Sequence, residues 1–247
     1  MLDEAYQALS ELQDTHWWNV GARHIYRKLL DLGIGPSSKP QRMLDVGCGS
    51  GANFELLSEY GSITGLDVST QALMKIGARP TLGLVQASVD ALPFATDSFD
   101  GVHLLGVIEH LDDDLAALRE AVRVGKDGAV VLLLTSALPI LWSHHDEANL
   151  HRRRYLRPQL AALFAQAGLR AEVLSYQNFF VFPATLIVRM FQRFTSSGPR
   201  FDVGKPPEFI NRLLIKLVSL EAWLLGRINL PIGVDLVALC RINKSCG

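Results

Sequence analysis

The chain has 247 residues, of which 49% are hydrophobic and 20% are charged, and its formal net charge is −1. This length and apolar content suit one large domain, or one domain that carries an insertion. A charge so close to zero gives no basic field of the kind that attracts nucleic acid, so we expect no nucleic-acid partner.

The first 40 residues are predicted to be helical. Apolar residues at helical spacing predict two amphipathic helices, at 2–14 and 20–32. A linker rich in Gly, Pro and Ser, at 33–40, then leads into the next part of the chain. We therefore interpret residues 1–40 as a helical segment in front of the core.

Residues 41–178 alternate between strand and helix patterns. Such alternation predicts a parallel sheet with helices on both faces, which binds its ligand at the carboxyl ends of the strands. Strands are predicted at 42–46, 62–66, 82–86, 99–105, 128–135 and 170–176, with helices from about 51, from 69, at 112–124 and at 157–167.

Residues 179–230 depart from this alternation. An aromatic stretch at 179–194 and a polar linker are followed by an amphipathic helix at about 208–228. A last strand is predicted at 233–242. We interpret 179–230 as a helical insertion. The final strand and the tail form the last segment of the chain, residues 231–247.

Three alternating glycines, Gly47, Gly49 and Gly51, follow the first strand, and Asp67 ends the second strand. Glycine lets the backbone approach a ligand without a Cβ in the way. A carboxylate at the tip of the next strand can accept hydrogen bonds from both ribose hydroxyls. The pattern indicates a nucleoside-containing ligand and also fits the dinucleotide fingerprint. Asp45, which could pair with an ammonium group, argues against NAD.

Further blocks at 88–94, 98–105 and 109–111 occur in order after the second strand. With the glycine loop they resemble the class I S-adenosylmethionine (SAM)-dependent methyltransferases, most closely the type 11 small-molecule group, over residues 42–174. The resemblance implies SAM as cofactor. It also implies a Rossmann-like α/β fold with a seven-stranded, mostly parallel sheet, whose last strand is antiparallel and enters between the fifth and sixth.

The resemblance also implies a set of cofactor-binding residues along the carboxyl edge of the sheet. Asp45 would face the ammonium group and Asp67 would bind the ribose. Ser88 would lie at the adenine edge, where many relatives carry Asp. The complete set is Asp45, Gly47, Gly49, Gly51, Asp67, Val68, Ser88, Val89, Gly106 and Val107.

The loop after the fifth strand holds the candidate catalytic residues. Methyl transfer needs a positioned acceptor and sometimes a base. His145 and His151 are candidate bases because imidazole titrates near neutrality, and Asp146 could orient either of them. Arg153 and Tyr155 could bind an anionic part of the substrate. The alternative is that the charged residues only tie the loop to the domain.

Two aromatic features suggest contact with the substrate. Trp17 and Trp18 are neighbours whose side chains point apart, so one could cover the ligand. Relatives often carry a similar His-Trp-Trp segment as a lid, which implies such a lid here. The aromatic segment 179–228 could close a hydrophobic pocket or touch a membrane surface. Alternatively, it forms a dimer interface or ordinary core.

No metal site is expected. The pair Glu109-His110 is similar to one that can hold a divalent metal in ubiquinone-type O-methyltransferases, but a glycine, Gly106, stands where that set has a second Glu. The histidine spacing at 144–151 matches no zinc template.

The sequence therefore predicts a SAM-dependent methyltransferase that acts at oxygen or nitrogen of a small-molecule or glycolipid-like acceptor. Two alternatives are a carbon methyltransferase on a quinone or polyketide-like ring, and a SAM-binding interaction protein without catalysis. The sparse cysteines and the acidic N-terminus, which is unlike a signal peptide, predict a cytoplasmic protein. No apolar run reaches the roughly 18 residues of a membrane span, so only peripheral membrane contact is expected.

Overall fold

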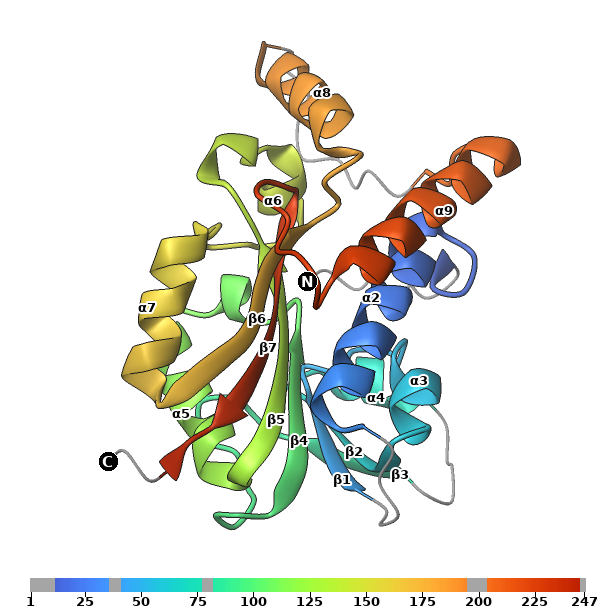
Figure 1. Ribbon diagram of the computed structural model, residues 1–247. Helices are drawn as coiled ribbons and strands as arrows, with labels where there is room; N and C mark the ends of the chain where they lie inside the picture. Colours follow the sequence, from blue (N-terminus) through green and yellow to red (C-terminus); the bar gives the residue numbers. More distant parts are fainter. Residues whose placement is uncertain (1–11, 36–40, 77–81, 195–203, 245–247) are drawn as a thin grey trace.

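The computed structural model describes residues 12–35, 41–76, 82–194 and 204–244. Its centre is a seven-stranded sheet with helices on both faces (Figure 1). The strands are β1 (Gln41–Val46), β2 (Gly61–Asp67), β3 (Leu82–Gln86), β4 (Phe99–Leu105), β5 (Gly125–Ser136), β6 (Leu169–Gln177) and β7 (Asp235–Ile242).

The strands are ordered β3-β2-β1-β4-β5-β7-β6. From β3 to β5 all neighbours are parallel, whereas β7 runs antiparallel to both β5 and β6. This confirms the predicted sheet, including the place and direction of its last strand. All parallel strands end at one edge, so the loops that follow β1, β2 and β4 meet there.

β5 starts earlier than predicted, at Gly125 instead of 128. Phe99 of β4 already pairs with Gly125, and the register resumes only at Gly101 and Val130. Residues 126–129 therefore lie in an irregularity inside the strand. Pairing with β4, which local sequence does not reveal, extends β5 across them.

Each face of the sheet has its own apolar core. Leu104 and Val131 pack against one helical layer, whereas Met43 and Leu132 pack against the other, because successive strand residues point to opposite faces. The first layer contains α5 (Asp114–Val124) and α7 (Arg157–Ala167). The second contains α2 (Trp17–Gly33), α3 (Phe54–Ser58) and α4 (Thr70–Ile76), with α9 (Glu208–Leu224) lying along α2 (Figure 1).

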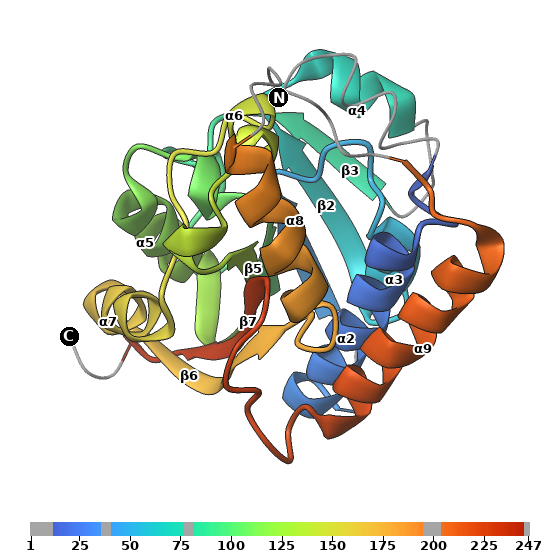
Figure 2. The ribbon, with the colours of Figure 1, turned by 90° about the horizontal axis from the view of Figure 1, so that it is seen from above.

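The insertion between β6 and β7 is helical, as predicted. It contains α8 (Phe182–Phe194) and α9. Three short elements follow β4 and β5: η1 (Ile108–His110), η2 (Pro139–Leu141) and α6 (His144–Ala148). Seen from above, α6 lies beside one end of α8 (Figure 2). Within the described ranges, no helix is both long and apolar enough to cross a membrane.

α2 begins at Trp17, three residues before the predicted start. The His16 side chain accepts a hydrogen bond from the Trp18 backbone N–H, which caps the helix. Of the other N-terminal helix predicted, residues 2–11 lie outside the described residues.

Asn211 of α9 attaches that helix to the start of α2. Its Oδ1 accepts from the Trp17 backbone N–H at 2.9 Å, and its Nδ2 donates to the Thr15 carbonyl at 2.9 Å. The side chain is only 2% exposed. Further along, a Cβ on Gly21 would lie 2.7 Å from Val218, so the two helices are in close contact. The helical insertion, which comes late in the chain, thus supplies the contacts that hold the start of α2.

We expect Asn211→Ala to lower the free energy of unfolding by about 1–3 kcal/mol, because it leaves a buried N–H and a carbonyl without their partner. Urea denaturation measures this loss. Arg212→Ala is the control, since Arg212 forms only an exposed pair with Glu208 on the same helix. Equal losses in the two variants would contradict the role given to Asn211.

Candidate active site

A cavity of about 810 Å³ opens at the carboxyl edge of the sheet. Its size is typical of pockets for small ligands. Its walls come from the loops after β1 and β4, the tip of β2, the segment after β3 and the loop after α6. The residues lining it are Gln13, Asn19, Asp45, Gly47, Cys48, Gly49, Ser50, Ala52, Asn53, Leu66, Asp67, Val68, Ala87, Ser88, Val89, Leu105, Gly106, Val107, His110, Leu111, Glu147, Leu150, His151 and Arg152.

The glycine loop is shaped by close backbone contacts. Gly47 has a φ of +68°, and a Cβ there would lie 2.7 Å from Val107 Cγ2. The Asp67 carboxylate accepts hydrogen bonds from the backbone N–H groups of Gly49 and Ser69, each at 2.8 Å. A carboxylate has further lone pairs, so Asp67 can fix the loop and still accept from a ligand.

Asp45 places an acid at the floor of the cavity. It is 2% exposed. Burial, and then the nearby charge of Asp67, raise the pKa of Asp45 to about 7. A carboxylate held in this way favours a cationic partner, because a positive charge offsets the cost of its burial. Burial likewise raises the pKa of the neighbouring Cys48 thiol, so this cysteine is no nucleophile.

The predicted cofactor set converges on this cavity with one exception. All of its members line the cavity except Gly51. Gly51 has a φ of +78°, and a Cβ there would lie 2.8 Å from the Phe54 ring. The third glycine therefore serves the turn and its packing.

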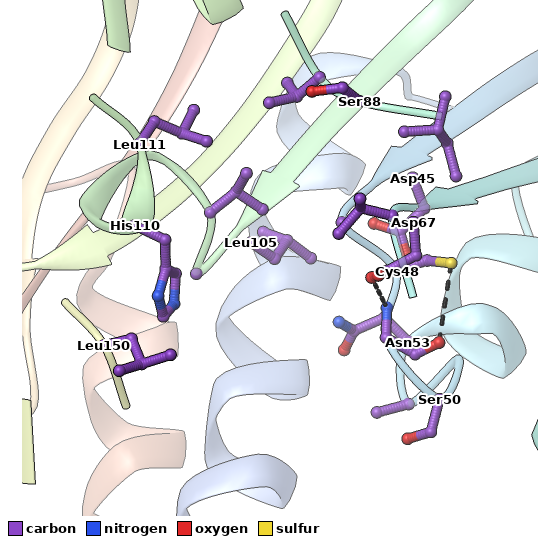
Figure 3. A pocket seen from close by; sticks show the side chains of 18 of the residues that line it. Asp45, Cys48, Ser50, Asn53, Asp67, Ser88, Leu105, His110, Leu111 and Leu150 are labelled. Atoms are coloured by element: carbon purple, nitrogen blue, oxygen red, sulfur yellow. Dashed lines mark hydrogen bonds between the residues drawn. The ribbon is translucent and has the colours of Figure 1, made fainter. Parts of the chain in front are cut away.

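The other end of the cavity is apolar and carries two histidines. Figure 3 shows His110, Leu111 and Leu150 across the cavity from Asp45 and Asp67. Neither leucine was predicted, because nothing in the sequence separates them from core leucines. The cavity therefore has a polar end beside the glycine loop and an apolar end beside the imidazoles.

Leu150 is held in a backbone conformation that a leucine rarely adopts. Its φ is +58°, and its side chain is 53% exposed. The Leu150 N–H donates to the Glu147 carbonyl at 3.0 Å, and the His151 N–H donates to the Asp146 carbonyl at 2.8 Å. Strain of this kind is typical of ligand-binding sites. Here it holds an apolar side chain at the cavity wall.

His151 is oriented by Asp146. Its Nδ1 lies 2.9 Å from Asp146 Oδ1, which also accepts from Arg154 Nε at 2.8 Å. Burial alone would raise the pKa of Asp146, but the hydrogen bond from His151 and the charge of Arg154 hold this pKa well below its usual range. Asp146 is therefore ionised, and Nδ1 of His151 carries the proton. In the neutral ring, Nε2 is an acceptor.

The adjacent residues Glu109 and His110 come together with His151, which is distant from them in sequence. One ligand atom from each lies within 4.8 Å of the others. The rings of His110 and His151 are 4.7 Å apart, edge to face. Burial, and then the charge of His151, lower the pKa of His110 to about 4, so it is neutral near pH 7. No motif or spacing in the sequence indicated that His151 would join this pair.

The second candidate base, His145, does not line the cavity. Its ring centroid lies 6.3 Å from that of His151, and its Nδ1 is buried without a hydrogen-bond partner. Burial, and then the charge of Arg189, lower its pKa to about 4. Of the two histidines predicted as bases, the geometry thus favours His151.

The residues predicted to bind substrate have partners within the protein. Arg153 Nη1 donates to Asp114 Oδ2 at 3.0 Å, and the Tyr155 hydroxyl donates to the same atom at 2.6 Å. These contacts tie the loop to α5. Trp17 and Trp18 pack edge to face, with ring centroids 5.4 Å apart, beside a small apolar cluster. None of these four residues lines the cavity.

A protein-family model described as a methyltransferase domain matches residues 44–133. A demethylmenaquinone methyltransferase of Staphylococcus aureus (strain MRSA252) is 31% identical over 180 residues, which cover 68% of this chain and 72% of that protein. The matched region contains the glycine loop, Asp67 and the Glu109-His110 pair.

Two solved structures have the same fold at 17% sequence identity. An S-adenosylmethionine-dependent methyltransferase from Mesorhizobium loti matches with a TM-score of 0.53, over 83% of this chain and 93% of that one. The cyclase SpnF matches with a TM-score of 0.55, over 88% and 81%. The fold alone therefore does not fix the chemistry. Together with the family model and the bacterial relative, however, it confirms what the motifs predicted: the chain belongs to the SAM-dependent methyltransferases, with SAM as its cofactor.

Proposed function

We propose that this methyltransferase moves the methyl group of SAM to a hydroxyl oxygen of an apolar small molecule, with His151 as the base. One observation carries the proposal. The Asp146-bound imidazole of His151 stands at the apolar end of the cavity, while Asp45 and Asp67 stand at its polar end. A cofactor held by the two acids and an acceptor beside His151 share this one cavity.

The polar end fits SAM. Gly47, without a Cβ, lets the glycine loop pack directly against Val107 at the cavity wall. The buried Asp45 carboxylate suits the ammonium group of the methionine part of SAM. We assign the ribose hydroxyls to Asp67, and the adenine edge to Val68 and Ser88 with Val89. The methionine part is assigned to a group of small or apolar residues, Gly47, Gly49, Gly51, Gly106 and Val107, of which Gly51 contributes through the loop turn.

The proposed chemistry needs one proton acceptor. When bound, SAM supplies a methyl group that an oxygen nucleophile takes in line as the carbon–sulfur bond breaks. Nε2 of His151 receives the hydroxyl proton of the acceptor. The ionised Asp146 stabilises the resulting imidazolium through Nδ1. Arg154, in turn, keeps Asp146 charged at pH 7.

The acceptor is proposed to have an apolar body. Leu105, Leu111 and Leu150 line the acceptor end, and burying apolar surface against them contributes roughly 25 cal/mol per Å². The demethylmenaquinone methyltransferase relative favours a second candidate, methylation of a ring carbon in a quinone-like acceptor. His151 would serve both reactions by taking the proton of a hydroxyl. In methylation at carbon, the ring hydrogen would then leave as a proton and the hydroxyl would be restored.

The same proposal includes contact with a lipid surface. Ile187, Val188 and Phe191 of α8 are exposed, as are Phe209 and Leu213 of α9. The sequence of α8 contains arginines but no acid, which suits an anionic membrane. We therefore place the enzyme in the cytoplasm at the membrane surface, with a lipidic or lipid-linked acceptor.

SAM affinity is expected to depend on pH through Asp45. Below about pH 7 its carboxyl is protonated and must release a proton to meet the ammonium group. Affinity should therefore rise with pH by up to tenfold per unit and level off above about 7. Isothermal titration in two buffers of different ionisation enthalpy measures both affinity and proton release.

Asp45→Asn should abolish this slope and weaken SAM binding. Glu55→Gln, which removes an exposed charge on α3, is the control and should keep the wild-type slope. A slope that survives in Asp45→Asn would show that another group releases the proton, and would remove Asp45 from the cofactor site.

His151→Gln should lower kcat by about 10²–10⁴-fold, the usual range for a general base, and leave SAM affinity within about twofold. The assay follows radioactive methyl transfer from SAM to a panel of phenols, quinols and long-chain alcohols. His144→Gln is the control, because it removes a nearby imidazole that does not line the cavity.

Product analysis by NMR separates the alternatives. A new methyl on oxygen supports the proposal, and one on a ring carbon supports the quinone-type reaction. Wild-type protein that binds SAM yet methylates nothing in the panel would favour the non-catalytic binding protein. Equal rates in His151→Gln and wild type would exclude His151 as the base.

A further inference from the structure

We propose that Glu109, His110 and His151 bind a divalent transition-metal ion at the acceptor end of the cavity. Glu109 and His110 lie in η1, after β4, and His151 follows α6. Their ligand atoms, one carboxylate oxygen and two imidazole nitrogens, lie within 4.8 Å of one another. Both histidines line the cavity, so an ion can reach them from solvent.

Each of the three side chains is held by a contact that leaves one ligand atom for the cluster. Nδ1 of His151 is bound to Asp146, which leaves Nε2. Glu109 Oε2 accepts from the Thr135 hydroxyl at 3.0 Å, and the carboxylate also accepts from the backbone N–H groups of Glu109 and Ser136. A carboxylate has about four lone-pair positions, so one remains for an ion. The neutral His110 ring donates its one N–H to the backbone carbonyls of Asn149 and Leu150, which leaves the other nitrogen as an acceptor. Three acceptor atoms thus face one another, an arrangement that a cation between them stabilises.

The supporting contacts are those expected around a metal. A histidine ligand usually donates its other ring N–H to a carboxylate, which fixes the ring and raises its basicity. Asp146 does this for His151, and is itself fixed by Arg154 Nε and by the Ser143 backbone N–H at 2.9 Å. Asp146 is fully buried. The orientation of His151 is therefore set before any ion arrives.

The donor set selects the class of metal. Two imidazoles and one carboxylate suit Zn²⁺, Fe²⁺ or Co²⁺, whereas Mg²⁺ and Ca²⁺ prefer oxygen ligands. Metal–ligand bonds of about 2.0–2.2 Å need ligand atoms roughly 3.4 Å apart in a tetrahedral site. Side-chain rotations that move the ligand atoms by about 1 Å would bring them to this spacing. Three protein ligands leave a coordination position for the acceptor oxygen.

This inference depends on the proposed function only for where the acceptor binds. Nε2 of His151 cannot bind an ion and take a proton at once. A bound ion would act as a Lewis acid that lowers the pKa of the acceptor hydroxyl, whose proton would then pass to water instead of to His151. The metal-free protein retains His151 as its base, so the two states can be told apart.

Metal binding is tested on the untagged full chain after removal of metals with a chelator. Co²⁺ is titrated and followed by its visible absorption, which reports nitrogen ligands, and Zn²⁺ is titrated by calorimetry. We expect one ion per chain. His110→Ala and His151→Ala should each raise Kd at least tenfold, and Asp146→Asn should raise it 10–100-fold through its effect on His151.

His144→Ala is the matched control, since it removes a neighbouring imidazole that lies outside the cluster. Circular dichroism and SAM affinity verify that each variant is folded. Binding that survives in His110→Ala and His151→Ala, or that His144→Ala abolishes, would overturn the metal site. So would the absence of binding to the wild type.

Methyl-transfer assays keep the two proposals separate. His110→Ala removes a metal ligand and leaves the His151–Asp146 pair in place. A ratio of metal-loaded to metal-free rate that falls to about one in this variant supports the metal site, whatever its metal-free rate is. Transfer that is identical with and without metal, in a protein that binds none, overturns the metal site and leaves the base role of His151 standing.

Discussion

The buried carboxylate of Asp146 organises the acceptor end of this enzyme. It accepts hydrogen bonds from the Ser143 backbone, from His151 and from Arg154, whose other arm reaches the Ala137 carbonyl. A fully buried charge is stable only when all its partners are in place. The one group therefore starts α6, fixes the tautomer of His151 and ties the loop to the end of β5. Without this carboxylate, the apolar side chains of the cavity and the His151 imidazole would not be held in fixed positions relative to each other.

Much of the fold could be predicted from the sequence, because its signals are local. Apolar runs, turn residues and helical spacing located the strands and gave the order of elements, and the family resemblance supplied the antiparallel β7. The errors came from distant partners. β5 extends to Gly125 because Phe99 pairs with it across an irregular register. α2 begins at Trp17 because His16 caps it and Asn211 holds its first N–H. The His16 cap is a local contact that the prediction overlooked. No short window of sequence, however, contains both Phe99 and Gly125, or both Trp17 and Asn211.

In the site, too, the features with local sequence signals were predicted and those that depend on distant contacts were not. Gly47, Asp45 and Asp67 lie in consecutive elements, so their convergence on one cavity followed from the order of strands. The acceptor end is built from the loops after β4 and α6, and the meeting of His110 with His151 depends on how these loops fold over each other. Sequence also cannot tell which way a loop arginine points, and Arg153 turns back to Asp114 instead of lining the cavity.

The attachment of α9 to α2 has a consequence for the order in which the chain folds. Trp17 and Asn211 are 194 residues apart, so the N-terminal helix leaves the ribosome long before the residue that secures its first turn. Until then, the apolar side of α2 that faces Val218 has no cover. The sheet from β1 to β5 can pair during synthesis, but β7 reaches its place between β5 and β6 only at the end. A nascent chain therefore exposes a sheet edge and a helix face that the last fifth of the protein closes together.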